Sequence, residues 1–150
     1  MLFKKKEVKN PLLMKENIRM NCDAMPQEQV IEEIGRMLVA SGYVKEDYIE
    51  AMKKRELSFS THVGNGIAMP HGVEEAKKEI LSSGIAVMAF PNGTKWAENE
   101  VKLVVGIAGV GDEHLEILGN IAMKLGMPED VETLVTATAE QVYETLSGEE

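Results

Sequence analysis

The sequence of 150 residues contains a single cysteine, Cys22, so no disulfide can form within the chain. Such sparing use of cysteine is typical of a reducing compartment. No apolar run approaches the roughly 20 residues of a membrane-spanning helix. The N-terminal run Met-Leu-Phe-Lys-Lys-Lys is not followed by the apolar segment of a secretion signal. The sequence therefore predicts a cytoplasmic protein with no direct membrane insertion.

Basic residues are also scarce. The chain has 25 acidic and 16 basic residues, which gives a formal net charge of -9. A nucleic-acid binder needs a surplus of cations to displace the counterions of the phosphate backbone. The charge therefore disfavours nucleic acid as a partner and favours a partner with a basic face.

Several signatures of catalytic sites are missing. No glycine-rich loop ends in Gly-Lys-Ser/Thr, and there is no Gly-x-Ser-x-Gly motif. Cys22 has no basic neighbour in sequence to activate its thiol. The three histidines, His62, His71 and His114, lack the spacing of a metal site. We expect neither a metal nor another cofactor, and a metal-dependent hydrolase that uses all three histidines is a weaker alternative.

A chain of this length with 44% hydrophobic residues can bury one good core, so we expect a single domain over residues 1–150 with its core at about 13–147. Apolar periodicity and turn residues predict helices and strands that alternate, which favours an α/β fold with a sheet between helices. The residues before this core read as a loose N-terminal end. The predicted helices span 26–41, 45–57, 112–125, 128–136 and 138–146, and the predicted strands span 80–90, before a turn at 91–93, and 101–108.

Two histidines lie at the ends of predicted elements beside glycines. His71 ends a short apolar run within residues 64–72, where an imidazole can be both held and reachable. The alternative is a hydrogen-bonded strand end with no chemical role. His114 falls in the first turn of the helix over 112–125, where a neutral ring could donate a hydrogen bond to a phosphoryl oxygen. The alternative there is an exposed histidine.

Arg55 lies at the end of a predicted helix, sixteen residues before His71. A guanidinium group can hold two phosphoryl oxygens at once, so Arg55 could complete a phosphoryl-binding site with His71 and His114. The alternative is a cation that only complements the helix dipole.

The surroundings of the two histidines carry a resemblance. With His71 in Gly-Asn-Gly-Ile-Ala-Met-Pro-His-Gly and His114 in Gly-Ile-Ala-Gly-Val-Gly-Asp-Glu-His-Leu, the chain resembles the enzyme IIA components of the phosphoenolpyruvate-dependent sugar phosphotransferase system, in their mannitol–fructose family. The resemblance extends from about Leu13 to the C-terminus. The tracts 60–66 and 106–114 look closer to mannitol-type members than to fructose-type or nitrogen-regulatory members.

The resemblance implies an α/β sandwich with a mixed, mostly parallel five-stranded sheet flanked by helices. It implies that His71 accepts a phosphoryl group from the histidine phosphocarrier protein HPr and passes it to a cysteine on a separate IIB domain, and that His114 and Arg55 are its active-site partners. Apolar residues near the histidines, with Met69 and Val110 as candidates, would dock both proteins. The alternative is a nitrogen-type regulatory module that binds a kinase, a channel or a transcription factor when its phosphorylation changes.

Overall fold

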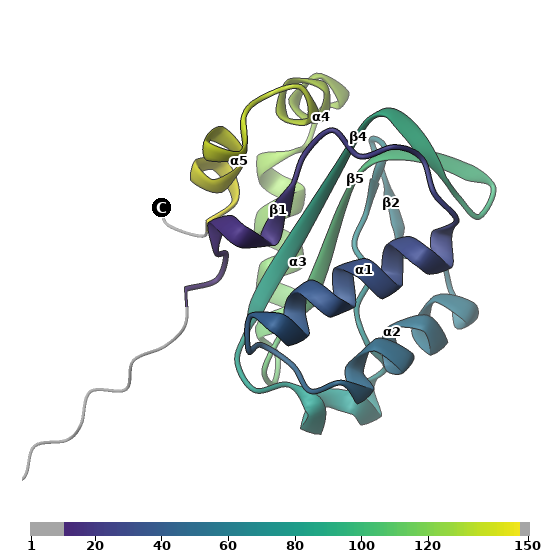
Figure 1. Ribbon diagram of the computed structural model, residues 1–150, viewed down its shortest axis with the longest axis vertical. Coiled ribbons are helices and arrows are strands. Elements are labelled where there is room, and N and C mark those ends of the chain that lie inside the picture. The colour runs from purple at the N-terminus through teal and green to yellow at the C-terminus, as the bar shows by residue number, and fades with distance from the viewer. Residues whose placement is uncertain (1–10, 148–150) are drawn as a thin grey trace, which may run out of the picture.

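The computed structural model of the protein describes residues 11–147. These residues form a five-stranded sheet in the order β1-β4-β5-β3-β2, with helices on both faces (Figure 1). The expected α/β sandwich with a five-stranded mixed sheet is confirmed. The prediction for residues 1–10 concerns a segment outside the described part of the chain.

A long hairpin forms the centre of the sheet. Strands β4 and β5 pair antiparallel, β1 pairs parallel with β4, β3 pairs parallel with β5, and β2 pairs antiparallel with β3. Two of these four pairings are parallel. The other two, the β4–β5 hairpin and the β2–β3 pair, are antiparallel. The strands are β1 (Ile18–Arg19), β2 (His62–Gly64), β3 (Ile67–Ala68), β4 (Gly84–Trp96) and β5 (Asn99–Ala108).

All five predicted α-helices are present, with ends that differ from the prediction by at most two residues. Two short 3-10 helices, η1 (Lys15–Asn17) and η2 (Glu74–Glu79), were not predicted. Within residues 11–147, no helix has both the length and the apolar character needed to cross a bilayer. The α-helices are α1 (Gln27–Ala40), α2 (Asp47–Ser58), α3 (Glu113–Lys124), α4 (Pro128–Val135) and α5 (Ala139–Leu146).

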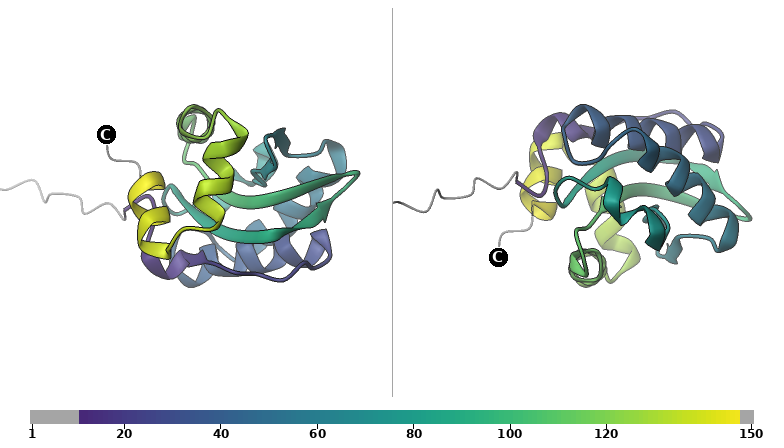
Figure 2. Two further views of the ribbon diagram at one scale, coloured as in Figure 1. Left: turned by 90° about the horizontal axis from the view of Figure 1, so that it is seen from above. Right: turned by 90° about the horizontal axis from the view of Figure 1, so that it is seen from below.

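The sheet separates two hydrophobic cores, because successive residues of a strand point to opposite faces. On one face, Met88 and Phe90 of β4 pack with the apolar sides of α1 and α2. On the other face, Ile85 and Val87 pack with α3, α4 and α5. Figure 2 shows the sheet between these two helical layers. Burial on both sides explains why residues 84–90 of β4 and 103–108 of β5 read as continuous apolar runs in the sequence.

The turn predicted at residues 91–93 is wrong. These residues lie inside β4, where the register shifts between Ala89 and Thr94, and the hairpin turns only after Trp96. Pro91 donates no hydrogen bond, and such a residue is tolerated where the strand bulges. At Gly93 the φ angle is +84° and the Glu100 side chain occupies the space that a Cβ would need, so this glycine serves the bulge.

The true turn contains Ala97, whose φ of +57° is unusual for a residue other than glycine. Its backbone N–H donates a hydrogen bond to the Gln27 side chain at 2.9 Å. The strand predicted over 80–90 begins later in the structure, at Gly84, because Ile80 forms only an isolated bridge with Val44. The turn carries no Asn-Gly or Asp-Gly pair, so local turn chemistry did not reveal it.

Candidate active site

The two histidines meet at one edge of the sheet. Because β3 and β5 run parallel, their carboxyl ends lie at the same edge. His71 follows β3 by three residues, and His114 is the second residue of α3, the helix that follows β5. The N–H of Ile107 donates to the carbonyl of Pro70 at 2.9 Å, which holds the His71 segment against the end of β5. The centroids of the two imidazole rings are 6.1 Å apart.

A cavity of about 270 Å³ lies at this edge. Its wall contains both histidines and Arg55, so the structure brings together all three residues that the sequence singled out. The full lining is Tyr48, Arg55, His71, Gly72, Val73, Glu74, Lys77, Ile80, Gly109 and His114. Three further polar side chains of the wall were not predicted as site residues from the sequence: Tyr48, Glu74 and Lys77.

The ring of His71 is held in one orientation. Its Nδ1 lies 3.0 Å from the carbonyl oxygen of Met69. A carbonyl oxygen can only accept, so Nδ1 carries the proton and donates it to this bond. The lone pair of the neutral ring then belongs to Nε2, which makes Nε2 the nucleophilic atom.

The surroundings of His71 favour its neutral form. Burial lowers the pKa of His71 below its usual value near 6.5, and electrostatic interactions with Arg55 and with His114 act in the same direction. The hydrogen bond to Met69 and the negative charge of Glu56 act in the opposite direction. Because the net shift is downward, the Nε2 lone pair is available at neutral pH.

Tyr48 connects the His71 segment to the sheet. Its hydroxyl donates to the carbonyl of Ile107 and accepts from the backbone N–H of Gly72, each at 2.9 Å. A Cβ at Gly72 would lie 2.5 Å from the Tyr48 ring, so glycine is the residue that fits beside this ring. Burial raises the pKa of Tyr48 to about 12, which keeps the hydroxyl protonated and able to donate.

The loop before α3 is also closely packed. A Cβ at Gly109 would lie 2.3 Å from the backbone nitrogen of His114, so the chain can reach α3 along this path only with glycine at that position. The hydroxyl of Ser83 accepts from the N–H of Val110 at 2.9 Å and donates to the carboxylate of Glu113. These contacts fix the start of α3 and with it the backbone of His114.

Arg55 lies in the last turn of α2. Its Nη1 donates to the carbonyl of Phe59 at 2.7 Å, and the guanidinium carbon lies 5.8 Å from the centroid of the Phe59 ring. A guanidinium group has five N–H donors in a planar fork. The contact with Phe59 uses one nitrogen and leaves donors for an anion in the cavity.

His62 lies on β2 and does not line this cavity. Among residues 11–147, no three histidine, cysteine or acidic side chains are grouped closely enough to hold a metal ion. Burial raises the pKa of the Cys22 thiol, which disfavours the thiolate that a cysteine nucleophile requires.

Of the two apolar residues expected to dock partner proteins, Met69 is too buried to do so. Met69 is only 2% exposed, because its side chain belongs to the core between the sheet and α3. Val110 is 44% exposed and follows Gly109 of the cavity wall, and its part in docking stays a prediction. Leu115, which adjoins His114, is 59% exposed.

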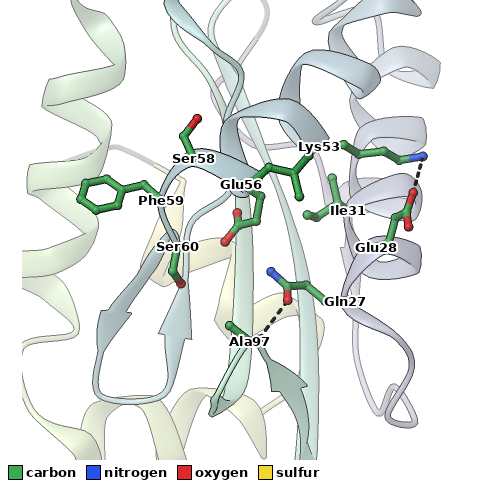
Figure 3. A pocket seen from close by; sticks show the side chains of 10 residues that line it. Gln27, Glu28, Ile31, Lys53, Glu56, Ser58, Phe59, Ser60 and Ala97 are labelled. Carbon is green, nitrogen blue, oxygen red and sulfur yellow. Dashed lines mark hydrogen bonds and ion pairs between the residues drawn. The ribbon is translucent and has the colours of Figure 1, made fainter.

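A larger cavity of about 600 Å³ lies between α1, the end of α2 and the hairpin turn (Figure 3). It contains none of the three predicted site residues, and the side chains that line it include Glu56, Phe59 and Ala97. Phe59 nevertheless links the two cavities, since its carbonyl holds Arg55. The smaller cavity is the candidate active site because His71, His114 and Arg55 converge there.

Comparison with known proteins agrees with this geometry. Residues 11–148 match the sequence model of the family described as "Phosphoenolpyruvate-dependent sugar phosphotransferase system, EIIA 2". The chain belongs to this family. It is therefore a phosphotransferase component of the enzyme IIA type, and the family resemblance seen in the sequence is confirmed.

Two relatives illustrate how closely this enzyme IIA follows the family. It is 47% identical over 131 residues to the mannitol-specific phosphotransferase enzyme IIA component of Bacillus subtilis, a match that covers 87% of this chain and 92% of the relative. Its fold is similar to that of the Escherichia coli mannitol enzyme IIA solved in complex with phosphorylated enzyme IIB. That match has a TM-score of 0.83 and 33% identity over 89% of this chain and 96% of the other.

Proposed function

We propose that this protein accepts a phosphoryl group from HPr on Nε2 of His71 and passes it to a cysteine of a IIB domain. The observation that carries the proposal is the fixed ring of His71. Its Nδ1–H is occupied by the Met69 carbonyl, and its pKa is lowered, so Nε2 offers a lone pair at neutral pH. This ring lines a cavity with His114 and Arg55. Family membership supports phosphoryl transfer as the reaction.

The proposed transfer has two in-line steps. In the first, the Nε2 lone pair of His71 forms a bond to phosphorus while the phosphorus–nitrogen bond of phospho-HPr breaks, and its electron pair returns to the HPr imidazole. In the second, a thiolate of IIB attacks the same phosphorus and the electron pair returns to Nε2 of His71. Catalysis of such transfers rests mainly on positioning and on stabilising the charge of the equatorial oxygens.

His114 and Arg55 are proposed to stabilise that charge. Both line the cavity with His71, and the imidazole rings of the two histidines lie 6.1 Å apart between centroids. Arg55 contributes a permanent positive charge and N–H donors. His114 contributes a ring N–H at the start of a helix, where the dipole also favours an anion.

We propose mannitol as the transported sugar. The supporting observation is that the relative from Bacillus subtilis, at 47% identity, is named mannitol-specific. The Escherichia coli structural neighbour was solved in complex with phosphorylated enzyme IIB, which supports a IIB domain as the acceptor. The net charge of -9 suits a basic docking face on HPr.

The test is the intact mass of the protein after incubation with phosphoenolpyruvate, enzyme I and HPr. We expect one acid-labile phosphoryl group on the wild type and on His62→Ala, and none on His71→Ala. His62 is the matched control, because it is a histidine on β2 outside the cavity. Normal labelling of His71→Ala would refute the proposal.

Addition of a mannitol IIB domain tests the second step. We expect the label to leave this protein within seconds and to be found on the IIB cysteine. A label that stays on His71 in the presence of IIB would instead favour the regulatory alternative, in which phosphorylation changes binding to another protein.

A further inference from the structure

Lys77 of η2 contacts the imidazole of His114, which lies in the first turn of α3. Its ammonium nitrogen lies 3.2 Å from Nδ1 of the imidazole and donates to the carbonyl of Gly111. It also forms an ion pair of 3.6 Å with Glu74. The Lys77 side chain is 23% exposed and lines the candidate active site.

The contact decides which nitrogen of His114 carries the proton. An ammonium group has three donors and no acceptor, so the ring nitrogen that faces it must hold a lone pair. Nδ1 of a neutral His114 therefore accepts from Lys77, and the ring proton is on Nε2. His71 has the opposite arrangement, because the Met69 carbonyl takes the proton of its Nδ1.

The two imidazoles are thus held in complementary forms. His71 offers a lone pair at Nε2, and His114 offers an N–H at Nε2. One ring can attack a phosphorus atom while the other donates a hydrogen bond to an oxygen bound to it. The partners that set these forms are different in kind: a carbonyl for His71 and an ammonium group for His114.

We infer that Lys77 is a positioning residue that keeps His114 as a hydrogen-bond donor to the transferring phosphoryl group. Three acceptors surround its ammonium group: the imidazole of His114, the carbonyl of Gly111 and the carboxylate of Glu74. They match the three donors of that group, so Lys77 acts through His114 rather than on the phosphoryl group itself. The role of Lys77 in phosphoryl transfer rests on the proposed function, whereas the protonation state of the His114 ring does not.

The ring state is measured on the unphosphorylated protein. Long-range correlation of ring protons with nitrogen-15 distinguishes a protonated from an unprotonated ring nitrogen. At a pH where both rings are neutral, we expect His114 to be protonated on Nε2 with a hydrogen-bonded, unprotonated Nδ1, and His71 to be protonated on Nδ1. A proton on Nδ1 of His114 would overturn the inference, whatever the outcome of the transfer experiment.

Substitutions of Lys77 then test whether it causes the protonation state of the His114 ring. In Lys77→Met, the Nδ1 signal of His114 should move toward that of a nitrogen without a hydrogen bond, while the His71 signals stay in place. Lys77→Arg should restore the hydrogen-bonded signal, because arginine is also only a donor. Lys78→Met is the matched control, since Lys78 is exposed on the same element and makes no hydrogen bond or ion pair with any described residue. An unchanged Nδ1 signal in Lys77→Met would refute the role of Lys77.

A double-mutant cycle separates positioning from direct action. Single-turnover acceptance from phospho-HPr should fall about tenfold in Lys77→Met, the factor that corresponds to one hydrogen bond lost in the transition state. In a His114→Ala background, the same substitution should have no further effect. A second tenfold loss in that background would mean that Lys77 acts on the phosphoryl group directly and would overturn the inference.

Discussion

The indole N–H of Trp96 donates a hydrogen bond of 2.8 Å to the carboxylate of Glu56, the residue that follows Arg55. The same carboxylate accepts from the backbone N–H and from the hydroxyl of Thr61, at 2.8 and 2.7 Å. Trp96 and Thr61 are 0% and 4% exposed. Glu56 therefore ties the end of α2, the hairpin and the approach to β2 together around the larger cavity (Figure 3).

Removal of the Glu56 side chain should destabilise the protein. Glu56→Ala leaves the N–H groups of Trp96 and Thr61 without their acceptor, and a buried donor without a partner costs about 1–3 kcal/mol. We expect the free energy of unfolding, measured with urea, to fall by about 2–4 kcal/mol. Glu56→Gln should lose less than half as much, because the amide oxygen can accept both N–H groups and the amide nitrogen can donate to the hydroxyl. Equal losses in the two variants would contradict this account.

Glu56 also influences His71 through its charge. Burial lowers the pKa of His71, and the negative charge of Glu56 opposes this shift. Glu56→Gln removes that charge, so the pKa of His71 should fall further below its value in the wild type. The ring proton shifts of His71, followed by NMR as a function of pH, measure this change. A pKa that rises in Glu56→Gln would show that Glu56 does not act in this way.

Protonation of His71 also makes stability depend on pH. Since the folded protein has a His71 pKa below the usual 6.5, the unfolded chain binds more protons on this residue as the pH falls below that value. Stability from the neutral ring is therefore complete above about pH 6.5 and is lost progressively down to the folded pKa. We expect the free energy of unfolding of the wild type to decline more steeply in this range than that of His71→Gln. Parallel slopes would exclude His71 as the cause.

The sequence was sufficient for the five α-helices, for the presence of the two long strands though not for the bounds of the first, and for the grouping of His71, His114 and Arg55. Helical periodicity and glycines beside histidines are local signals, and parallel strand ends bring those residues to one edge. The hairpin turn was missed because Ala97 adopts a positive φ that its residue type does not indicate. Lys77 was missed because its contact with His114 spans 37 residues of sequence and follows from packing alone.

Loss of the Tyr48 hydroxyl should loosen the His71 segment. Tyr48→Phe keeps the ring that packs against Gly72 but removes the acceptor of the Gly72 N–H. We expect a loss of about 1–3 kcal/mol in the free energy of unfolding, and slower acceptance of the phosphoryl group. Tyr143→Phe is the matched control, because the Tyr143 hydroxyl makes no hydrogen bond within residues 11–147. If both variants lose the same stability, the hydroxyl of Tyr48 has no special structural role.

Replacement of glycine by alanine should change stability in opposite directions at Gly109, before α3, and at Gly119, within α3. A Cβ at Gly109 would lie 2.3 Å from the backbone nitrogen of His114, whereas a Cβ at Gly119 meets no atom within 4 Å. Gly109→Ala must displace the start of α3, which should cost about 1–3 kcal/mol of stability and slow single-turnover phosphoryl acceptance roughly 100-fold if the ring of His114 moves by about 1 Å.

Gly119→Ala should instead stabilise the protein by about 0.5–1 kcal/mol, because alanine loses less conformational entropy than glycine in an exposed helix. Its rate of phosphoryl acceptance should match that of the wild type, since Gly119 lies in the middle of α3 and does not line the cavity. Urea unfolding and single-turnover acceptance, measured on both variants, check the pair. Wild-type transfer by Gly109→Ala would mean that the position of His114 at the start of α3 does not limit the reaction.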